Sequence, residues 1–380
     1  MTSRSMSVAR AADETRVSPA ERAAMLRALE LAALGPIAGP NPRVGAVLLA
    51  PDGTRIGEGH HRGAGTPHAE VAALTDARAA GADPRGSTAV VTLEPCRHTG
   101  RTGPCTRALV DAGVARVVVS VPDPGAVAGG GAADLRSAGV DVTVGALRTE
   151  GEALLRVWLA AVRSGRPYVT VKVATTLDGR VAAADGTSRW ITSSESRAHA
   201  HGVRAEVDAI AVGTGTALAD DPALTARTAT GGLASSQPFR VVVGHRELPA
   251  AARMHGPGGE VLTLATHDPA EVLAVLAARD VRHVLVEGGP VLVTAFLRAG
   301  LVDEVHTYLA PTLLGAGRSA VGDLGIGTMA DALRLTLAEV HRLGSDVLLV
   351  ARPGNDGLPP PDVSPGHASR AEHATRVMEV

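Results

Sequence analysis

The chain of 380 residues has very few aromatic side chains: two Trp, two Tyr and two Phe. Proteins that bind single-stranded nucleic acid stack bases on aromatic rings, and this chain offers few such rings. Its formal net charge of -2 also provides no long-range attraction for a polyanion. We therefore expect no nucleic-acid partner, and any phosphate group that the protein binds must be held by a local group of residues.

Long apolar runs are missing as well, although 45% of the residues are hydrophobic. No run approaches the ~20 apolar residues that a transmembrane helix needs. Residues 1–16 contain basic side chains but no apolar segment after them, so they do not resemble a secretory signal. These observations predict a cytoplasmic protein that does not enter a membrane.

Cysteine is scarce, with only Cys96 and Cys105 in the whole chain. In a reducing compartment a metal-binding or catalytic role is more common for such a pair than a disulfide. Both cysteines lie in the segment TLEPCRHTGRTGPCTRAL, and the segment TPHAEVAAL, with a His and a Glu, precedes it. This clustering marks the region as a candidate site.

The length favours two domains, because a single hydrophobic core rarely grows beyond about 250–300 residues. Helices and strands alternate in both halves, which predicts a three-layer α/β/α domain and then a second α/β domain with a largely parallel sheet. The expected divisions are a flexible N-terminus at 1–17, the first domain at 18–147, a linker helix at 148–166, the second domain at 167–352 and a Pro-rich disordered tail at 353–380.

Periodicity, apolar runs and turn residues also place the individual elements. The first domain should contain helices at 18–34, 69–81 and 106–113, a hairpin at 44–61, strands at 87–95 and 115–124, and a helix followed by a strand across 133–145. The second should contain strands at 168–182, 239–244, 260–266, 283–289, 304–311 and 346–353, and a strand that runs into a glycine-rich turn across 208–218. Its helices should lie at 193–207, with Ser193 or Ser194 as the N-cap, at 270–280 and at 291–300.

His68 and Glu70 stand at the start of a predicted helix, and each cysteine follows a proline. One imidazole and two thiolates form a three-ligand set for Zn²⁺ that leaves the fourth tetrahedral position open for water. Zinc lowers the pKa of that water towards ~7, and a carboxylate beside the His ligand can pass a proton to a leaving amine. Each residue alone has an ordinary structural explanation, as a surface, helix-end or core side chain. Together, their order is the zinc-deaminase signature.

The spacing of the cysteines narrows the type of deaminase. Eight residues separate Cys96 from Cys105, whereas nucleic-acid deaminases have the C-x-x-C spacing. The segments PNPRVGAVLL, GEGHHRGAGTPHAEVAAL and VTLEPCRHTGRTGPC resemble the deaminase half of the bifunctional deaminase/reductase family of riboflavin biosynthesis. The resemblance implies that the first domain has a cytidine-deaminase-like fold, that His68, Cys96 and Cys105 bind zinc and that Glu70 is the catalytic proton carrier. It also implies substrate contacts at Asn41, His98, Arg101 and Thr102; a turn residue between two prolines is the less favoured alternative for Asn41.

Two segments depart from the pattern of this family. Arg97, Thr99 and Gly103 occupy places where the family usually has other residues, and the stretch DPGAVAGGGAADL is a shortened form without the family's Asn. The zinc ligands are unaffected. These segments are where a change of substrate would be expected.

The second half resembles the reductase half of the same family, whose domain is similar to dihydrofolate reductase. The resemblance is carried by VKVATTLDGRVA, TSRWITSSESR, VGTGTALADDPALTAR and VLVEGGPVLVTAFL. The glycines alone do not identify a cofactor site, because GTGTA lacks the G-x-G-x-x-G spacing of a Rossmann fingerprint. The resemblance implies NADPH contacts at Ala174, Trp190, Thr216, Asp220, Gly289, Pro290, Val291, Leu292, Val293, Thr294 and Ala295. It implies substrate contacts at Ser188, Arg204, Leu224, Arg227 and Glu287. Trp190 could equally be a core residue, and Asp178 either orients the ribose chain or is a plain turn residue.

The resemblance implies two consecutive reactions on a phosphorylated pyrimidine substrate. Zinc-dependent deamination of 2,5-diamino-6-(5-phosphoribosylamino)pyrimidin-4(3H)-one would precede NADPH-dependent reduction to 5-amino-6-(5-phosphoribitylamino)uracil, in a homodimer or higher homo-oligomer. The alternatives are a deaminase/reductase relative that acts on a related pyrimidine in a specialised pathway, a nucleoside or nucleic-acid deaminase, and a variant with one inactive domain. The last is disfavoured because all four residues of the zinc-site motif are present.

Overall fold

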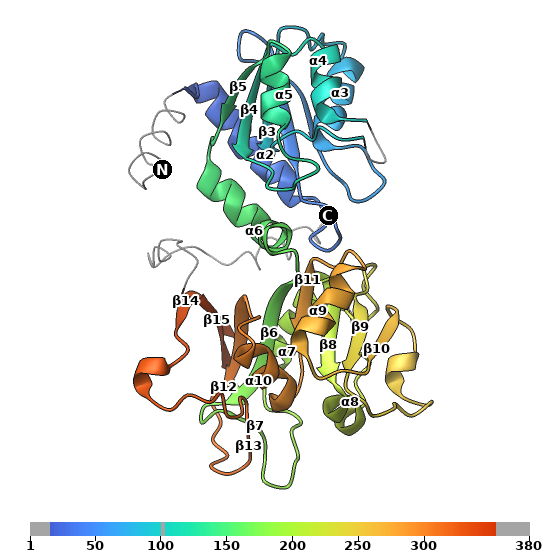
Figure 1. Ribbon diagram of the computed structural model, residues 1–380, viewed down its shortest axis with the longest axis vertical. Helices are drawn as coiled ribbons and strands as arrows, with labels where there is room; N and C mark the ends of the chain where they lie inside the picture. Colours follow the sequence, from blue (N-terminus) through green and yellow to red (C-terminus); the bar gives the residue numbers. More distant parts are fainter. Residues whose placement is uncertain (1–15, 100–102, 355–380) are drawn as a thin grey trace.

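The computed structural model describes residues 16–99 and 103–354, which form two α/β domains joined by a helix (Figure 1). Arg101 and Thr102, residues 1–15 and the tail beyond 354 lie outside the described residues. Within the described ranges, no helix is both long enough and apolar enough to span a membrane.

The first domain is built on a five-stranded sheet with the order β2-β1-β3-β4-β5. Its strands are β1 (Gly45–Leu49), β2 (Arg55–His60), β3 (Thr88–Leu93), β4 (Arg116–Val121) and β5 (Asp141–Val144). β1 runs antiparallel to both of its neighbours, whereas β3, β4 and β5 are parallel. The helices are α2 (Pro19–Ala33), α3 (Ala69–Ala79), α4 (Cys105–Asp111) and α5 (Gly131–Ser137).

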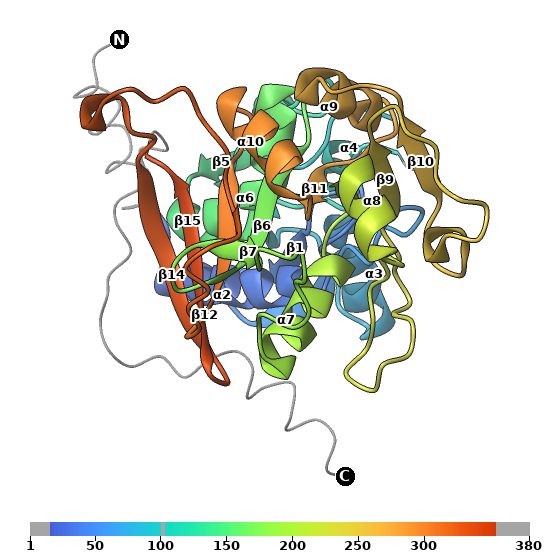
Figure 2. The same ribbon diagram turned by 90° about the horizontal axis from the view of Figure 1, so that it is seen from below.

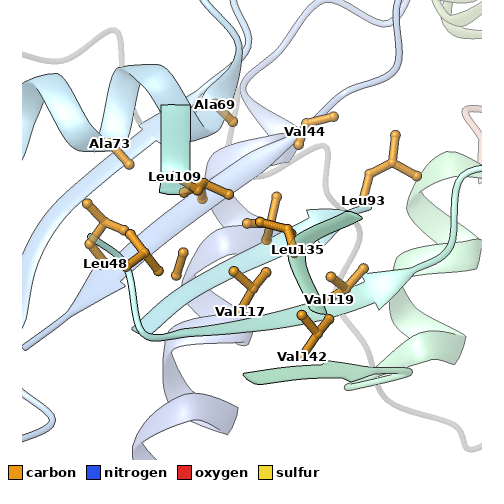
Figure 3. Packing of buried hydrophobic residues seen from close by; sticks show 14 of the residues in the cluster. Val44, Leu48, Ala69, Ala73, Leu93, Leu109, Val117, Val119, Leu135 and Val142 are labelled. Carbon is orange, nitrogen blue, oxygen red and sulfur yellow. The ribbon is translucent and has the colours of Figure 1, made fainter. Parts of the chain in front are cut away.

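Buried clusters lie on both faces of this sheet. On one face Leu109 of α4 and Leu135 of α5 pack with Val117 and Val119 of β4 (Figure 3). On the other, Met25 of α2 packs with strand residues such as Val47. The predicted three-layer α/β/α arrangement is therefore confirmed.

Helix α6 (Arg148–Ser164) connects the two domains and contacts both sheets. It ends where Gly165 adopts a left-handed conformation with φ 70°, close to the end of the linker helix predicted at 148–166. The Arg156 guanidinium on α6 donates to Glu304 Oε2 of the second domain at 2.8 Å. The helix is thus anchored to the second sheet by a charge-assisted hydrogen bond as well as by packing.

The second domain contains an eight-stranded sheet with the order β10-β9-β8-β11-β6-β12-β15-β14. Its strands are β6 (Tyr168–Thr176), β8 (Ala209–Gly213), β9 (Phe239–Val243), β10 (Val261–Leu264), β11 (His283–Val286), β12 (Glu304–Ala310), β14 (Leu335–Leu343) and β15 (Asp346–Pro353). The strands from β10 to β12 are parallel, and β15 and β14 add an antiparallel edge. A largely parallel sheet is what the sequence predicts.

Helices cover both faces of this sheet. Helices α9 (Pro269–Ala277) and α10 (Pro290–Arg298) lie on one face, and α7 (Ser194–Ala205) and α8 (Thr214–Asp220) on the other (Figure 2). Two short 3₁₀ helices, η1 (Arg253–His255) and η2 (Met329–Asp331), and a small sheet of β7 (Arg180–Ala182) and β13 (Arg318–Ser319) complete the domain. Ser193 is the N-cap of α7, because its side chain accepts a hydrogen bond from Ser196 N.

Two local predictions were wrong, and one strand was missed. The glycine-rich stretch after β8 forms helix α8, where burial of Thr214 and Ala217 offsets the poor helix propensity of glycine. The single strand expected over 168–182 is broken by a turn at residues 177–179 into β6 and β7. Strand β14 was not predicted; it forms by pairing with β15 at the sheet edge and leaves apolar side chains such as Val340 exposed.

Candidate functional site

The three predicted zinc ligands meet at one end of the first sheet. His68 is the N-cap of α3, Cys96 lies in the loop after β3, and Cys105 is the first residue of α4. Their ligand atoms all lie within 4.8 Å of one another. His68 Nδ1 is 3.2 Å from Cys105 Sγ and 3.5 Å from Cys96 Sγ. The structure therefore brings together residues that are up to 37 positions apart in the chain.

The electrostatics of the three side chains suit a divalent cation. A hydrogen bond from Cys105, assisted by one from His68, lowers the pKa of Cys96 to about 4 against the opposing effect of burial. The hydrogen bond with Cys96 and burial raise the pKa of Cys105. The two sulfurs thus share one negative charge, and a bound cation would favour the loss of the second proton. One nitrogen and two sulfur donors at this spacing fit zinc with one open position.

Glu70 lies in the first turn of α3 with only 4% of its surface exposed. Burial raises the pKa of its carboxyl group, which makes the group able to accept and hold a proton. It lines a cavity of about 330 Å³ whose polar lining residues are Asn41, His61, His68, Glu70, Glu94, Cys96, His98, Asp123 and Arg282. The predicted base therefore faces the same space as two of the predicted metal ligands, His68 and Cys96.

Two predicted substrate contacts also line this cavity. Asn41 Nδ2 donates to His61 Nε2 at 2.9 Å, and His61 Nδ1 donates to Pro67 O at 3.2 Å. Asn41 is thus held by a buried histidine instead of acting only as a turn residue. His98 Nδ1 is buried and has no hydrogen-bond partner among the described residues, so it is available to a ligand.

The divergent segment after β4 forms another wall of the cavity. The buried carboxylate of Glu94 accepts hydrogen bonds from Asp123 N at 3.0 Å and from Ala132 N at 2.8 Å, which fixes both ends of the segment. The lining residues between these ends are Gly125, Ala126, Val127 and Ala128. Arg97 is not in the lining; its Nε lies 3.1 Å from Asp134 Oδ2 on α5.

Sequence reasoning missed His61, Glu94, Asp123, Trp158 and Arg282 as lining residues. His61 belongs to the quoted segment GEGHHRGAG, so its motif was a usable signal. Glu94 directly precedes Pro95 and Cys96, and Asp123 lies in the segment noted as divergent. Trp158 and Arg282 come from distant parts of the chain, where no local pattern marks them.

Gly131 packs against the loop that carries Cys96. A Cβ atom at this position would lie 1.9 Å from Pro95 O. We expect Gly131→Ala to lower the free energy of unfolding by about 1–3 kcal/mol through overpacking, and to reduce zinc content. Chemical denaturation and metal analysis measure the two effects. Gly202→Ala is the matched control, because a Cβ there meets no described atom within 4 Å; equal stability of the two variants would contradict this packing argument.

The second domain contains a buried charged group formed by two predicted substrate residues, Arg204 and Glu287, and by Lys172, which was not predicted. Arg204 Nε and Nη2 donate to the two carboxylate oxygens of Glu287 at 2.6 and 2.8 Å, and Lys172 Nζ lies 4.0 Å from Glu287. Burial alone would raise the pKa of Glu287, but Arg204 and then Lys172 hold it at about 2. Arg204 and Glu287 therefore form an ionised pair joined by two hydrogen bonds.

Two predicted cofactor residues are in direct contact at the carboxyl ends of β8 and β11. Gly289, the N-cap of α10, donates its backbone N–H to Thr216 Oγ1 at 2.9 Å, and a Cβ on Gly289 would lie 2.8 Å from that oxygen. In open α/β sheets, ligands bind at this edge. Within the predicted segment, Val291 is exposed, whereas Leu292 and Val293 are buried in the core; they could reach a cofactor only through their backbones.

The remaining predicted residues of the second domain differ in their exposure and local contacts. Trp190 is 70% exposed, so it is not a core residue, and the Arg197 guanidinium lies 4.5 Å from its ring centre. Leu224 is buried with φ 48°, and Arg227 Nη1 donates to Gly231 O. Ala174, Ser188, Thr216 and Asp220 are half-buried.

Asp178 has the role of a turn residue in this structure. Its carboxylate accepts hydrogen bonds from Thr176 Oγ1 and from the backbone of Leu314 and Gly315. These bonds, led by the one from Thr176, lower the pKa of Asp178 to about 2. The carboxylate is therefore used to hold two loops together.

Comparison with protein families gives one match for each half of the chain. Residues 19–121 match the cytidine and deoxycytidylate deaminase zinc-binding region, and residues 167–349 match the RibD C-terminal domain. The second match alone covers close to half of the chain. The first match contains the predicted zinc ligands and Glu70, and the second contains the Arg204–Glu287 pair.

Whole-chain comparisons agree with these matches. The chain is 50% identical over 311 residues to the riboflavin biosynthesis protein RibD of Mycobacterium tuberculosis, covering 82% of this chain and 90% of that protein. It is 41% identical over 360 residues to RibD of Escherichia coli, covering 86% and 97%. The solved structure of Acinetobacter baumannii RibD (form 2) superposes with a TM-score of 0.79 at 38% identity, covering 88% of this chain and 99% of that chain. The chain therefore belongs to the RibD family, the bifunctional deaminases and reductases of riboflavin biosynthesis.

Proposed function

We propose that the chain acts twice on one phosphorylated pyrimidine. It removes the 2-amino group of 2,5-diamino-6-(5-phosphoribosylamino)pyrimidin-4(3H)-one by hydrolysis, and it then reduces the ribosyl chain to give 5-amino-6-(5-phosphoribitylamino)uracil. A solved relative from Thermotoga maritima, 33% identical with a TM-score of 0.77, carries both of these activities in its name. The observation that carries the proposal is the clustering of three metal ligands beside the cavity that the buried Glu70 lines, with His68 and Cys96 in the cavity wall.

In the first reaction, His68, Cys96 and Cys105 hold zinc, which supplies an acidified water for attack on the ring carbon. Glu70 takes a proton from the attacking water and delivers it to the amino group, so that water is consumed and ammonia leaves. Asn41, oriented by His61, contacts the pyrimidine. His98, Arg101 and Thr102 form the remaining substrate contacts.

In the second reaction, the cofactor would be NADPH, which would supply a hydride to C1 of the ring-opened ribosylamine, while a proton from solvent completes the ribitylamino chain. The N-terminal backbone of α10, from Gly289 to Ala295, holds cofactor phosphate, with Ala174, Trp190, Thr216 and Asp220 as further contacts. The substrate contacts are Ser188, Arg204, Leu224, Arg227 and Glu287. Because Arg204 is committed to Glu287, we assign phosphate binding to Arg227 and the positioning of Glu287 to Arg204.

The proposal also covers the domain bounds, the cellular location and the oligomeric state of the enzyme. The two domains correspond to residues 18–147 and 167–352, and the chain works in the cytoplasm as a homodimer or higher homo-oligomer. A reducing environment suits the first site, because its two free cysteines must stay reduced to bind metal.

A second candidate function rests on one observation. The divergent residues 125–128 line the deaminase cavity, so a related pyrimidine from a specialised pathway is the alternative substrate.

Metal analysis and single-reaction assays test the proposal. The purified protein should contain one zinc per chain and release ammonia from the diaminopyrimidinone without a nicotinamide cofactor. With the deaminated substrate it should oxidise NADPH in preference to NADH. Zinc well below one per chain in protein purified without chelator would contradict the first site, and a preference for NADH would contradict the cofactor assignment.

A further inference from the structure

The deaminase cavity contains one permanently charged cation among the lining residues that the structure describes. Apart from Arg282, those residues include no Arg or Lys, whereas Glu70, Glu94 and Asp123 bring three carboxyl groups. Arg282 belongs to the second domain, where it directly precedes β11. Among the described residues that line the deaminase cavity, the only guanidinium therefore comes from the second domain.

The side chain of Arg282 is not fully used by the protein. Its Nε is buried and has no hydrogen-bond partner in the described part of the chain. Its Nη2 lies 3.6 Å from Asp280 Oδ1, and the Asp280 side chain is 76% exposed. Exposed ion pairs of this kind contribute little. Arg282 therefore has donor capacity left for an anion in the cavity.

The backbone around Arg282 is fixed to the first domain. The Asp208 carboxylate accepts a hydrogen bond from Arg282 N at 2.8 Å and also one from Gly39 N. Gly39 lies two residues before Asn41, the predicted pyrimidine contact. One carboxylate thus sets the position of a cationic residue in the second domain relative to the pyrimidine-binding segment in the first.

We propose that Arg282 is a substrate-binding residue of the deaminase reaction that holds the phosphate of the ribosyl phosphate group. This inference rests on the proposed function, because it takes the deaminase substrate to be a ribosyl phosphate. A phosphate brought among three carboxyl groups needs a compensating cation, and a guanidinium can form two parallel charge-assisted hydrogen bonds to it. The second domain then contributes directly to the first site.

The test compares Arg282→Gln with Arg279→Gln in the full chain. Arg279 is a near neighbour that pairs with Glu260 at the surface and does not line this cavity. For Arg282→Gln we expect the KM of ammonia release to rise about 10- to 100-fold with phosphorylated substrate, with kcat within about twofold. Arg279→Gln should match the wild type.

Three further measurements separate the possible outcomes. With the dephosphorylated substrate, the wild type and Arg282→Gln should have similar KM values; an equal loss on both substrates would overturn phosphate binding in favour of a structural role. An unchanged KM with phosphorylated substrate would also overturn it. Reduction of the deaminated substrate should stay normal in Arg282→Gln. If the wild type releases no ammonia from the phosphorylated diaminopyrimidinone, the proposed function fails, and the role of Arg282 is not the cause.

Discussion

Glu70→Gln is expected to lower the rate of ammonia release by about 100- to 10,000-fold, the usual contribution of a positioned general acid–base group. The amide has the size of the carboxyl group but cannot take a proton from water and return it to the leaving amine. Zinc content should not change, because Glu70 is not a ligand of the His68, Cys96 and Cys105 set. Oxidation of NADPH with the deaminated substrate should stay close to the wild-type rate.

The matched control is Glu271→Gln, because Glu271 is also a first-turn helix glutamate but lies exposed on α9. It should leave ammonia release unchanged. Loss of both activities in Glu70→Gln would contradict the assignment of two separate sites. Ammonia release at the wild-type rate would remove Glu70 from the reaction.

The second large effect is expected from Arg204→Gln. Removing the guanidinium leaves the buried carboxylate of Glu287 without its bidentate partner, which typically costs about 3–5 kcal/mol. We expect a clear fall in the melting temperature of the second domain and the loss of NADPH oxidation. At temperatures below that transition, ammonia release should persist. Calorimetry and the two separate assays measure these effects.

A second substitution separates stability from chemistry. Adding Glu287→Gln to Arg204→Gln removes the buried charge, so part of the lost stability should return while reduction stays absent. Arg298→Gln is the control for an exposed pair, because Arg298 lies 3.7 Å from the exposed Asp323, and it should change stability by less than about 1 kcal/mol. Wild-type melting and reduction in Arg204→Gln would refute the role assigned to the pair.

The zinc site could be predicted from the sequence because its chemistry restricts both residue type and order. His68, Glu70, Cys96 and Cys105 each belong to a short motif, and each motif sits at the end of an element that periodicity also identifies. The structure brings the three ligands together as the motif requires. Most strands and helices could be predicted for the same reason, since buried apolar runs and caps are local signals.

The lining of the cavity could not be predicted to the same extent, because it depends on contacts between distant segments. Trp158 reaches the cavity from α6 and Arg282 from the start of β11, and nothing in the residues around them indicates this. Helix α8 and strand β14 were missed because tertiary burial and edge pairing outweigh the weak local preferences of their sequences.

The central claim is that one chain deaminates and then reduces the same phosphorylated pyrimidine. The most direct test follows ammonia release and NADPH oxidation together after the diaminopyrimidinone ribosyl phosphate is added to the zinc-loaded protein. We predict that ammonia appears first and that NADPH oxidation then approaches one equivalent per ammonia. A zinc-loaded, folded protein that releases no ammonia from this substrate would contradict the claim and favour a related pyrimidine as the true substrate.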